Sequence, residues 1–184
     1  MALSIEKLRR EHRVIQKVLD LAVAELDRLE GAGAGDPVHL KRALDFARHY
    51  FDRVHHPHED LVFDRLQLRV PEAREAIEPL TAGHEALYEL GELLDEYLAR
   101  CTCEVGAFDT DFAAICRRYL ELQREHLARE EETALPLAER CLTEADWQAI
   151  AARQHARENL SAGERAAFRY GALYEFLMTA ANSN

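Results

Sequence analysis

The chain has 184 residues and a mass of 21.0 kDa, which corresponds to one domain or to one domain with an appendage. Hydrophobic residues make up 48% and charged residues 31%, a balance that allows a buried core and excludes a largely disordered chain. The 34 acidic side chains outnumber the 23 basic ones, and the net charge of −11 excludes non-specific nucleic-acid binding. Ala, Leu, Glu and Arg dominate, and no stretch alternates between apolar and polar residues, so the composition predicts an all-α fold.

No apolar run approaches the roughly 18 residues of a membrane span, and charges begin at Glu6, too early for the apolar segment of a signal peptide. We therefore expect a cytoplasmic protein without a membrane partner. Its four cysteines should be reduced thiols in that compartment. Cys101 and Cys103 are either a soft-metal or redox pair or two ordinary loop thiols.

Capping signals predict two long helices in the first part of the chain. The first helix begins after Ser4, an N-cap residue, and runs to about Glu30, where a glycine ends it. The second begins at Pro37, because an Asp-Pro pair combines an N-cap with proline at the first helical position. It ends near Val70, before the next proline.

Two more long helices follow. The third begins at Pro79 and ends around residues 101–106. Asp109 or Thr110 caps the fourth helix, which continues to about Cys141.

The chain after residue 142 is expected to form an appendage. A possible capping box over Thr143–Asp146 begins a fifth, shorter helix, and a last helical stretch covers residues 161–180. That stretch is rich in aromatic and leucine residues, which either pack across the bundle or form a homodimer interface. The predicted organisation is a domain over residues 1–142 and a C-terminal helical extension over residues 143–184.

Apolar residues recur every three or four positions along the first four helices, so each helix has one apolar face. Such helices, joined by short connections, fold up-down-up-down into an antiparallel four-helix bundle. Each apolar face contains one histidine, and these are His12, His55, His84 and His126. At ~1.5 Å per residue the four histidines lie ~26 Å from the same end of the bundle, so they share one layer. Their spacing also shows an internal repeat of one helical hairpin.

Two carboxylates complete the pattern. Glu59 follows His55 by four residues, and Glu130 follows His126 by four, so each pair lies on one helix face about a turn apart. An unpaired carboxylate on an apolar face costs several kcal/mol, and a bound cation removes that cost. Imidazole and carboxylate without thiolate suit iron, manganese or zinc. The predicted metal ligands are His12, His55, Glu59, His84, His126 and Glu130.

The pattern distinguishes a metal site from two other interpretations of these histidines. A single histidine on an apolar face is usually a hydrogen-bonded core residue, but four in one layer, two of them paired with glutamates, favour a metal site. A ferritin-type di-iron bundle needs glutamate three residues before histidine on two helices. Asp52 and Gln123 occupy those positions, which excludes the ferritin-type motif.

The pattern resembles the hemerythrin-like, or HHE cation-binding, domains over about residues 5–140. The resemblance is carried by His12, by the run HHPHED over residues 55–60, by His84, and by the run HLAREE over residues 126–131. It implies a cofactor of two iron ions in a non-haem di-iron centre. It also implies that Glu59 and Glu130 bridge both irons and that an oxo or hydroxo oxygen forms a third bridge.

The chain departs from the oxygen-carrying members of that family at one position. They have a second histidine four residues after the one in the third helix, where this chain has Tyr88. Two octahedral irons offer about twelve coordination positions, and the expected ligands fill about ten. The open positions favour reactivity over simple oxygen storage. Tyr88 is expected to bind iron, to hydrogen-bond a bound ligand, or to pack in the core.

Several neighbouring residues are alternative ligands. His56 with Asp60 is a second possible register in the HHPHED run, and Glu131 is a substitute for Glu130. Pro57 removes a backbone hydrogen bond inside the second helix, so we expect a kink beside the metal layer.

Three functions remain open from the sequence. The first is a di-iron protein that binds, senses or reacts with oxygen, peroxide or nitric oxide. The second is iron handling or the repair of iron–sulfur clusters, as in some relatives. The third is a metal-free interaction bundle. The sequence leaves enzymatic activity undecided.

Overall fold

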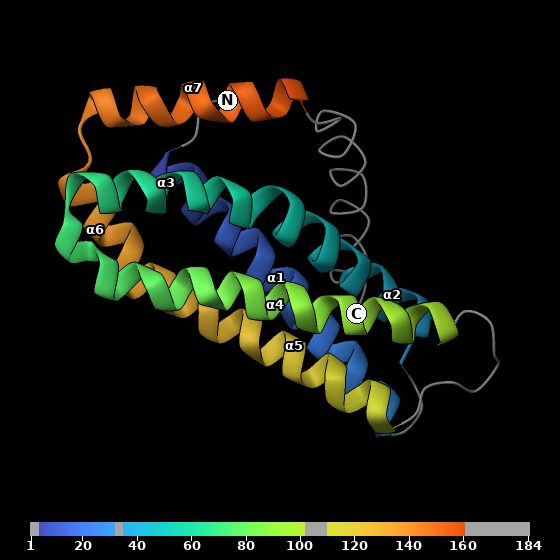
Figure 1. The fold of residues 1–184 in the computed structure, drawn as a ribbon. Helices are drawn as coiled ribbons and strands as arrows, with labels where there is room; N and C mark the ends of the chain where they lie inside the picture. The colour runs from blue at the N-terminus through green and yellow to red at the C-terminus, as the bar shows by residue number, and fades with distance from the viewer. Residues whose placement is uncertain (1–3, 32–34, 102–109, 161–184) are drawn as a thin grey trace.

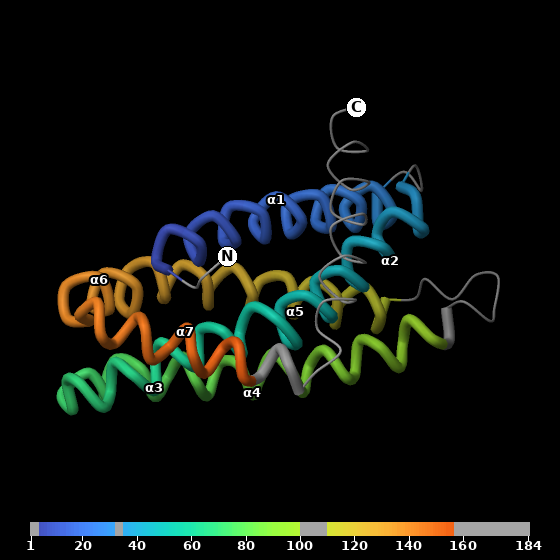
Figure 2. Tube along the Cα trace, turned by 90° about the horizontal axis from the view of Figure 1, so that it is seen from above, coloured from blue at the N-terminus to red at the C-terminus, as the bar shows by residue number. Residues whose placement is uncertain are grey.

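The computed structural model describes residues 4–31, 35–101 and 110–160. These residues form helices and turns without a strand, which confirms the predicted all-α fold. Four long helical segments run alternately up and down side by side, and a further helix lies on the outside (Figures 1 and 2). In chain order the elements are α1 (Ile5–Glu30), α2 (Pro37–Phe46), η1 (Ala47–His55), α3 (His56–Arg69), η2 (Pro71–Ala73), α4 (Arg74–Cys101), α5 (Thr110–Arg129), η3 (Glu130–Ala134), α6 (Leu135–Cys141) and α7 (Glu144–Leu160). None of the helices in these ranges has an apolar stretch long enough to cross a lipid bilayer.

Most predicted helix ends agree with the structure. The Ser4 side chain accepts a hydrogen bond of 3.2 Å from the Lys7 backbone N–H, and α1 ends at Glu30. The Asp36 side chain accepts one of 2.8 Å from the Val38 N–H at the start of α2. These side chains satisfy N–H groups that have no partner within the helix.

The expected start of the third helix was wrong. The helix α4 begins at Arg74, after the short turn η2, and Pro79 lies inside it. A proline inside a helix costs about 3 kcal/mol. Ile77 is fully buried by the earlier start, and burying such a side chain contributes about 1.5–3 kcal/mol. The apolar face of α4 therefore extends one turn further toward its N-terminus than the proline signal indicates.

Two of the long segments contain a widened, π-helical turn directly before a proline. The His56 N–H donates to the Phe51 carbonyl just before Pro57, and the Leu135 N–H donates to the Glu130 carbonyl just before Pro136. A proline ring clashes with the carbonyl four residues earlier in a regular α-helix, and a wider turn moves that carbonyl away. The disturbance expected at Pro57 thus takes the form of a wide turn.

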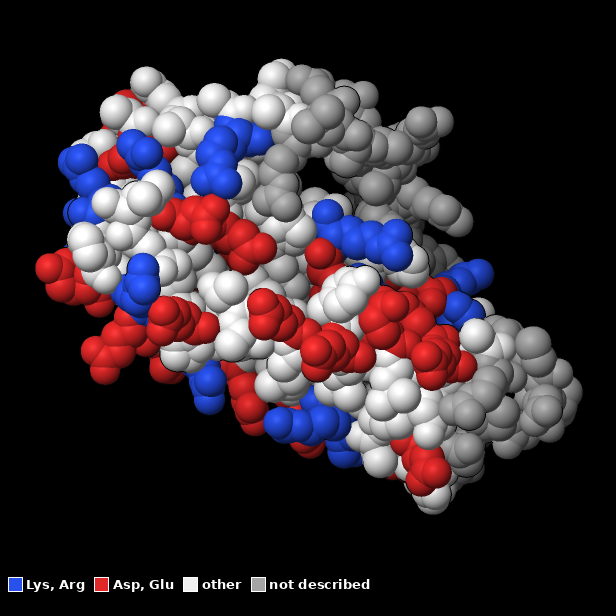
Figure 3. Space-filling model, in the orientation of Figure 1, with Lys and Arg blue, Asp and Glu red and all other residues white. Residues whose placement is uncertain are grey.

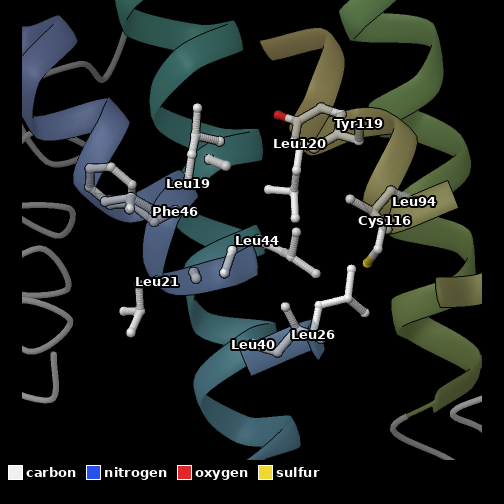
Figure 4. Packing of buried hydrophobic residues seen from close by; sticks show 14 of the residues in the cluster. Leu19, Leu21, Leu26, Leu40, Leu44, Phe46, Leu94, Cys116, Tyr119 and Leu120 are labelled. Carbon is white, nitrogen blue, oxygen red and sulfur yellow. The ribbon is translucent and has the colours of Figure 1, made fainter. Parts of the chain in front are cut away.

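The apolar core consists of two clusters. The larger one joins the second half of α1 to α2, α4 and α5, and it includes Leu26, Leu44, Cys116 and Tyr119 (Figure 4). The smaller one joins the start of α1 to α3, α6 and α7. The buried histidines and glutamates belong to neither cluster, although they lie on the same helices.

The helix α7 packs along α3 on the outside of the bundle (Figure 1). The expected capping box forms, because the Thr143 N–H donates to Asp146 at 2.8 Å and the Asp146 N–H reaches the Thr143 hydroxyl at 3.4 Å. Asp146 also accepts a hydrogen bond of 2.7 Å from Arg65 of α3. The helix has 17 residues, so it is shorter than α1 with 26 and α4 with 28, as expected. The predicted last stretch over residues 161–180 lies outside the described residues, and the homodimer stays a prediction.

The ion pair of Asp146 predicts a specific change on substitution. Asp146→Asn should loosen α7 from α3, because this buried side chain joins the cap of α7 to Arg65. Amide hydrogen exchange in α7 should become faster while exchange in α1 and α5 stays the same. Asp64→Asn is the matched control, since the Asp64–Arg153 pair joins the same two helices at 3.0 Å but is exposed. Equal exchange in the two variants would contradict an anchoring role of Asp146.

Candidate metal centre

Buried side chains from all four bundle segments gather in two adjoining groups. One group consists of His56, Glu59, His84 and His126, and the other of His12, His55, Glu59 and Glu130. Within each group the nitrogen and oxygen atoms that can bind a metal all lie within 4.8 Å of one another. No side chain in either group is more than 8% exposed. The structure therefore brings together all six predicted ligands and adds His56.

Glu59 belongs to both groups, and its two oxygens face different histidines. Its Oε1 lies 2.9 Å from His12 Nε2 and 3.3 Å from His55 Nε2. Its Oε2 faces the other group and lies 3.6 Å from His84 Nε2. A carboxylate in this position can bridge two metal ions.

Glu130 is arranged in the same way from the opposite side. Its Oε1 lies 2.8 Å from His126 Nε2 and 3.3 Å from His84 Nε2. Its Oε2 lies 3.7 Å from His12 Nε2. The two glutamates thus face each other's histidines across the layer, one from α3 and one from the wide turn η3.

Four inward-facing atoms of these residues form no hydrogen bond of good geometry among the described residues, although ion-pair contacts lie close to them. They are Oε2 of Glu59, Oε2 of Glu130, Nε2 of His55 and Nε2 of His126. A buried polar atom without a partner costs about 1–3 kcal/mol. Metal ions between the two groups would satisfy all four atoms, so the residues present fit a binuclear site.

The outward-facing ring nitrogens of three histidines contact carboxylates. His12 Nδ1 lies 2.8 Å from Glu131, His55 Nδ1 lies 3.1 Å from Glu11, and His84 Nδ1 lies 2.9 Å from Asp60. In metal sites such contacts fix the ring orientation and make the other nitrogen a stronger ligand. The contacts hold Nε2 of each ring toward the centre of the layer.

These contacts separate the alternative ligands left open by the sequence. Asp60 and Glu131 lie outside both groups and contact the outer nitrogens of His84 and His12. His58 lies toward α7, where Gln154 Nε2 is 3.5 Å from its Nε2. Of the residues in the HHPHED run, His55, His56 and Glu59 therefore belong to the two groups, and His58 and Asp60 do not.

His56 is the site residue that the sequence reasoning did not select. In a regular α-helix, which turns about 100° per residue, a residue next to His55 lies off the apolar face. The wide turn that ends at His55 changes this phase, and the His56 ring stacks on the His84 ring at 4.2 Å. The signal was the proline at position 57, since wide turns of this kind are frequent at functional sites.

A buried arginine supports His56 from behind. The Arg48 side chain is 4% exposed and donates to Asp52, to Glu92 at 2.8 Å and to Asp95 at 3.0 Å. The other Asp52 oxygen lies 3.4 Å from His56 Nδ1. Arg48 thus holds Asp52 in place, and Asp52 orients the ring of His56. Carboxylates orient three other histidines of the site in the same way.

Tyr88 and Gly83 of α4 each contact a residue at or behind the donor groups. Tyr88 is 51% exposed, and its ring lies over the Arg48 guanidinium at 5.7 Å. It is therefore not a core residue, and it lines the same pocket as His56 and His84. Gly83 lies against the ring of His126, because a Cβ at this position would be 2.6 Å from His126 Nδ1.

The family model of the hemerythrin HHE cation-binding domain matches residues 3–138. The chain belongs to this family. No curated protein and no solved structure matches it. The matched residues include all seven members of the two donor groups, so the family's cation-binding description applies to the same layer that the geometry identifies.

The histidines compensate the buried carboxylates of this HHE domain when no metal is bound. Burial lowers the pKa of His55, but its contacts with Glu59 and Glu11 outweigh burial and raise the pKa to about 10. Carboxylate contacts likewise outweigh burial at His84 and raise its pKa to about 11. Burial raises the pKa of the Glu59 carboxyl, but the surrounding histidines hold it well below its usual value. The carboxylates are therefore paired, unlike the unpaired charges expected from the sequence.

His56 behaves differently from these histidines. Burial and the neighbouring His84 hold the pKa of His56 well below its usual value. The ring is therefore neutral at physiological pH, which is the form of imidazole that binds metals.

The raised histidine pKa values predict how the stability of the metal-free protein depends on pH. His55 has a pKa of about 10 in the folded chain against an ordinary value of 6.5, so its protonation stabilises the fold below pH 6.5. This contribution should be lost as the pH rises toward 10. The melting temperature of the metal-free protein should fall over that range, whereas the metal-loaded protein should not show this fall. A constant or rising melting temperature of the metal-free protein would contradict the pairing.

Gly83 gives a second prediction. Gly83→Ala should weaken metal binding, because the added Cβ displaces the ring of His126, although alanine is the better helix former. We expect at least a tenfold loss of metal affinity, about the size seen when residues that orient metal ligands are changed. Helix content measured by circular dichroism should stay the same or rise. Unchanged affinity would show that the ring of His126 moves without losing its ligand position.

Proposed function

We propose that this protein is a non-haem di-iron protein of the hemerythrin type that binds or reacts with oxygen, peroxide or nitric oxide in the cytoplasm. The observation that carries this proposal is the arrangement of Glu59 and Glu130. Each directs one oxygen to one donor group and the other oxygen to the second group. Such a pair of carboxylates holds two ions next to each other.

The number and type of donors favour iron or manganese over zinc. Five imidazoles and two bridging carboxylates offer about nine protein donors to two ions, which is more than two tetrahedral zinc ions accept. None of the donors is a thiolate, which copper(I) and iron–sulfur clusters prefer. Iron is the proposed metal because five of the seven donor residues are imidazoles, which suit iron better than manganese, and because iron is redox-active where zinc is not.

His56 changes the expected reactivity. With His56 as a ligand the protein fills about nine of twelve positions, one more than the sequence alone predicted. Fewer positions then remain for external ligands. A pair of redox-active ions with few open positions supplies a place for one small ligand to bind and electrons to reduce it. Reversible oxygen storage, which the sequence disfavoured because of Tyr88, is therefore again compatible with the proposal.

The residues around the layer have separate tasks in this function. The outer carboxylates of Glu11, Asp60 and Glu131 hold the imidazoles in place. The apolar clusters on both sides limit the access of water to the layer.

Metal analysis tests the proposal most directly. Protein reconstituted with ferrous iron without oxygen should contain two irons per chain, one for each donor group. Exposure to oxygen should then produce charge-transfer absorption of a ferric di-iron centre in the near ultraviolet. Protein that folds but retains almost no iron, manganese or zinc would overturn the proposal in favour of a metal-free bundle.

Two neighbouring histidines provide a matched test of the ligand set. His56→Gln should lower iron affinity by at least about tenfold, since it removes a predicted ligand. His58→Gln, two residues away in the same run, should retain two irons and the same spectrum, because His58 lies toward Gln154. If both variants retain two irons with the wild-type spectrum, His56 is not a ligand.

A further inference from the structure

One pocket connects the donor layer with solvent. It has a volume of about 350 Å³, and both His56 and His84 form part of its wall. These two histidines are only 5% and 8% exposed, so their remaining exposure is consistent with this opening. An ion or small molecule that enters the pocket therefore meets two side chains of the donor groups, His56 and His84.

The wall of this pocket is acidic. Besides the two histidines it contains Asp52, Asp60, Glu85 and Glu89, and no Lys or Arg is among its described lining residues. Pro57 and Tyr88 complete the wall, and we call these eight lining residues the acidic mouth. The charge continues along α4, where seven acidic residues and no Lys or Arg lie between Arg74 and Arg100. Figure 3 shows acidic side chains over this helix, on the face where it is in front.

The positions of Glu85 and Glu89 do not stabilise α4. They are exposed and lie four residues apart on α4, where like charges destabilise a helix by about 0.2–0.5 kcal/mol. Neither forms an ion pair with a residue in the described ranges, whereas Glu92 and Asp95 of the same helix both contact Arg48. The uncompensated pair lies directly at the pocket.

A second, independent observation lies inside the mouth. The Asp52 side chain is 2% exposed, and its Oδ1 has no hydrogen-bond partner among the described residues. Its other oxygen is paired with Arg48. Asp52 lines the pocket, and its Oδ1 lies 3.4 Å from His56 Nδ1 without the geometry of a hydrogen bond. A buried carboxylate oxygen without a donor is a favourable contact for a passing cation.

We infer that the acidic mouth is the route by which divalent metal ions enter the site. The exposed glutamates of α4 attract the hydrated cation, the inner aspartates replace part of its water, and His56 and His84 then bind it. A negative opening raises the local concentration of cations and repels anions, whereas uncharged oxygen and nitric oxide are unaffected. The inference rests on the proposed function, because it assumes that the two donor groups bind metal.

The rate of metal uptake tests this inference in the full-length protein. Co²⁺ alone is the probe, since it is stable in air and absorbs visible light when bound by nitrogen and oxygen ligands. The test variant is Glu85→Gln with Glu89→Gln. The control variant is Glu75→Gln with Glu78→Gln, which removes the same charge from exposed positions at the start of the same helix. Stopped-flow absorbance then measures the uptake rate for both variants and for the wild type.

We expect the test variant to take up Co²⁺ about five- to tenfold more slowly than the control at low salt, where electrostatic attraction is strong. The difference should shrink at about 0.15 M salt, where charges are screened beyond ~8 Å. Both variants should still bind two ions per chain at equilibrium, because neither change touches a donor group.

Two other results have distinct meanings. If both variants bind two ions and take them up at equal rates, the mouth is not the entry route, and the proposed function is unaffected. If the wild type itself binds no Co²⁺, the proposed function fails and the inference fails with it.

Discussion

Two carboxylates in a closed layer are the constraint on which the structure depends. Glu59 and Glu130 are fully buried, and each contacts histidines from more than one helix. A buried carboxylate is stable only if positive charge and hydrogen bonds surround it. The bundle supplies these from all four segments, and three of the histidines are in turn held by carboxylates nearer the surface. Charge thus alternates outward from the centre of the layer.

The wide turns explain how two helices supply more ligands than a regular helix would. In a regular helix, adjacent residues such as His55 and His56 point about 100° apart, so only one of them faces the core. The π-helical turn before Pro57 brings both rings to the layer. A second wide turn begins at Glu130, itself one of the two buried glutamates of the donor layer. In both places a proline two residues beyond the wide turn gives a physical reason for it.

Much of the fold was accessible from the sequence because it depends on local signals. Ser4, Asp36 and Thr143 cap helices as their residue types predict, and the spacing of the histidines placed four of them in one layer. Pro79 misled the prediction, since the burial of Ile77 and Ala73 ahead of it offsets the cost of a proline inside the helix.

The sequence allows only part of the site to be predicted. Six members of the donor groups follow from periodicity, which is a property of regular helices. His56 does not follow from it, because its position depends on a departure from regular geometry. The partners of the outer nitrogens come from distant parts of the chain, such as Glu131 for His12, and periodicity within one helix cannot identify them. The exposure of Tyr88 likewise depends on how α4 is rotated against η1.

The division of the core into two apolar clusters has a consequence for cooperativity. Each cluster contains parts of at least three helical segments, and the polar layer between them is held by charge instead of apolar packing. Because the buried apolar residues divide into two clusters, we expect that one half of the metal-free bundle opens while the other stays folded. Ions bound by α1, α3, α4 and α5 at once would join the halves into a single unfolding unit. Loading would then raise the free energy of partial opening by as much as that of global unfolding, because both break the site.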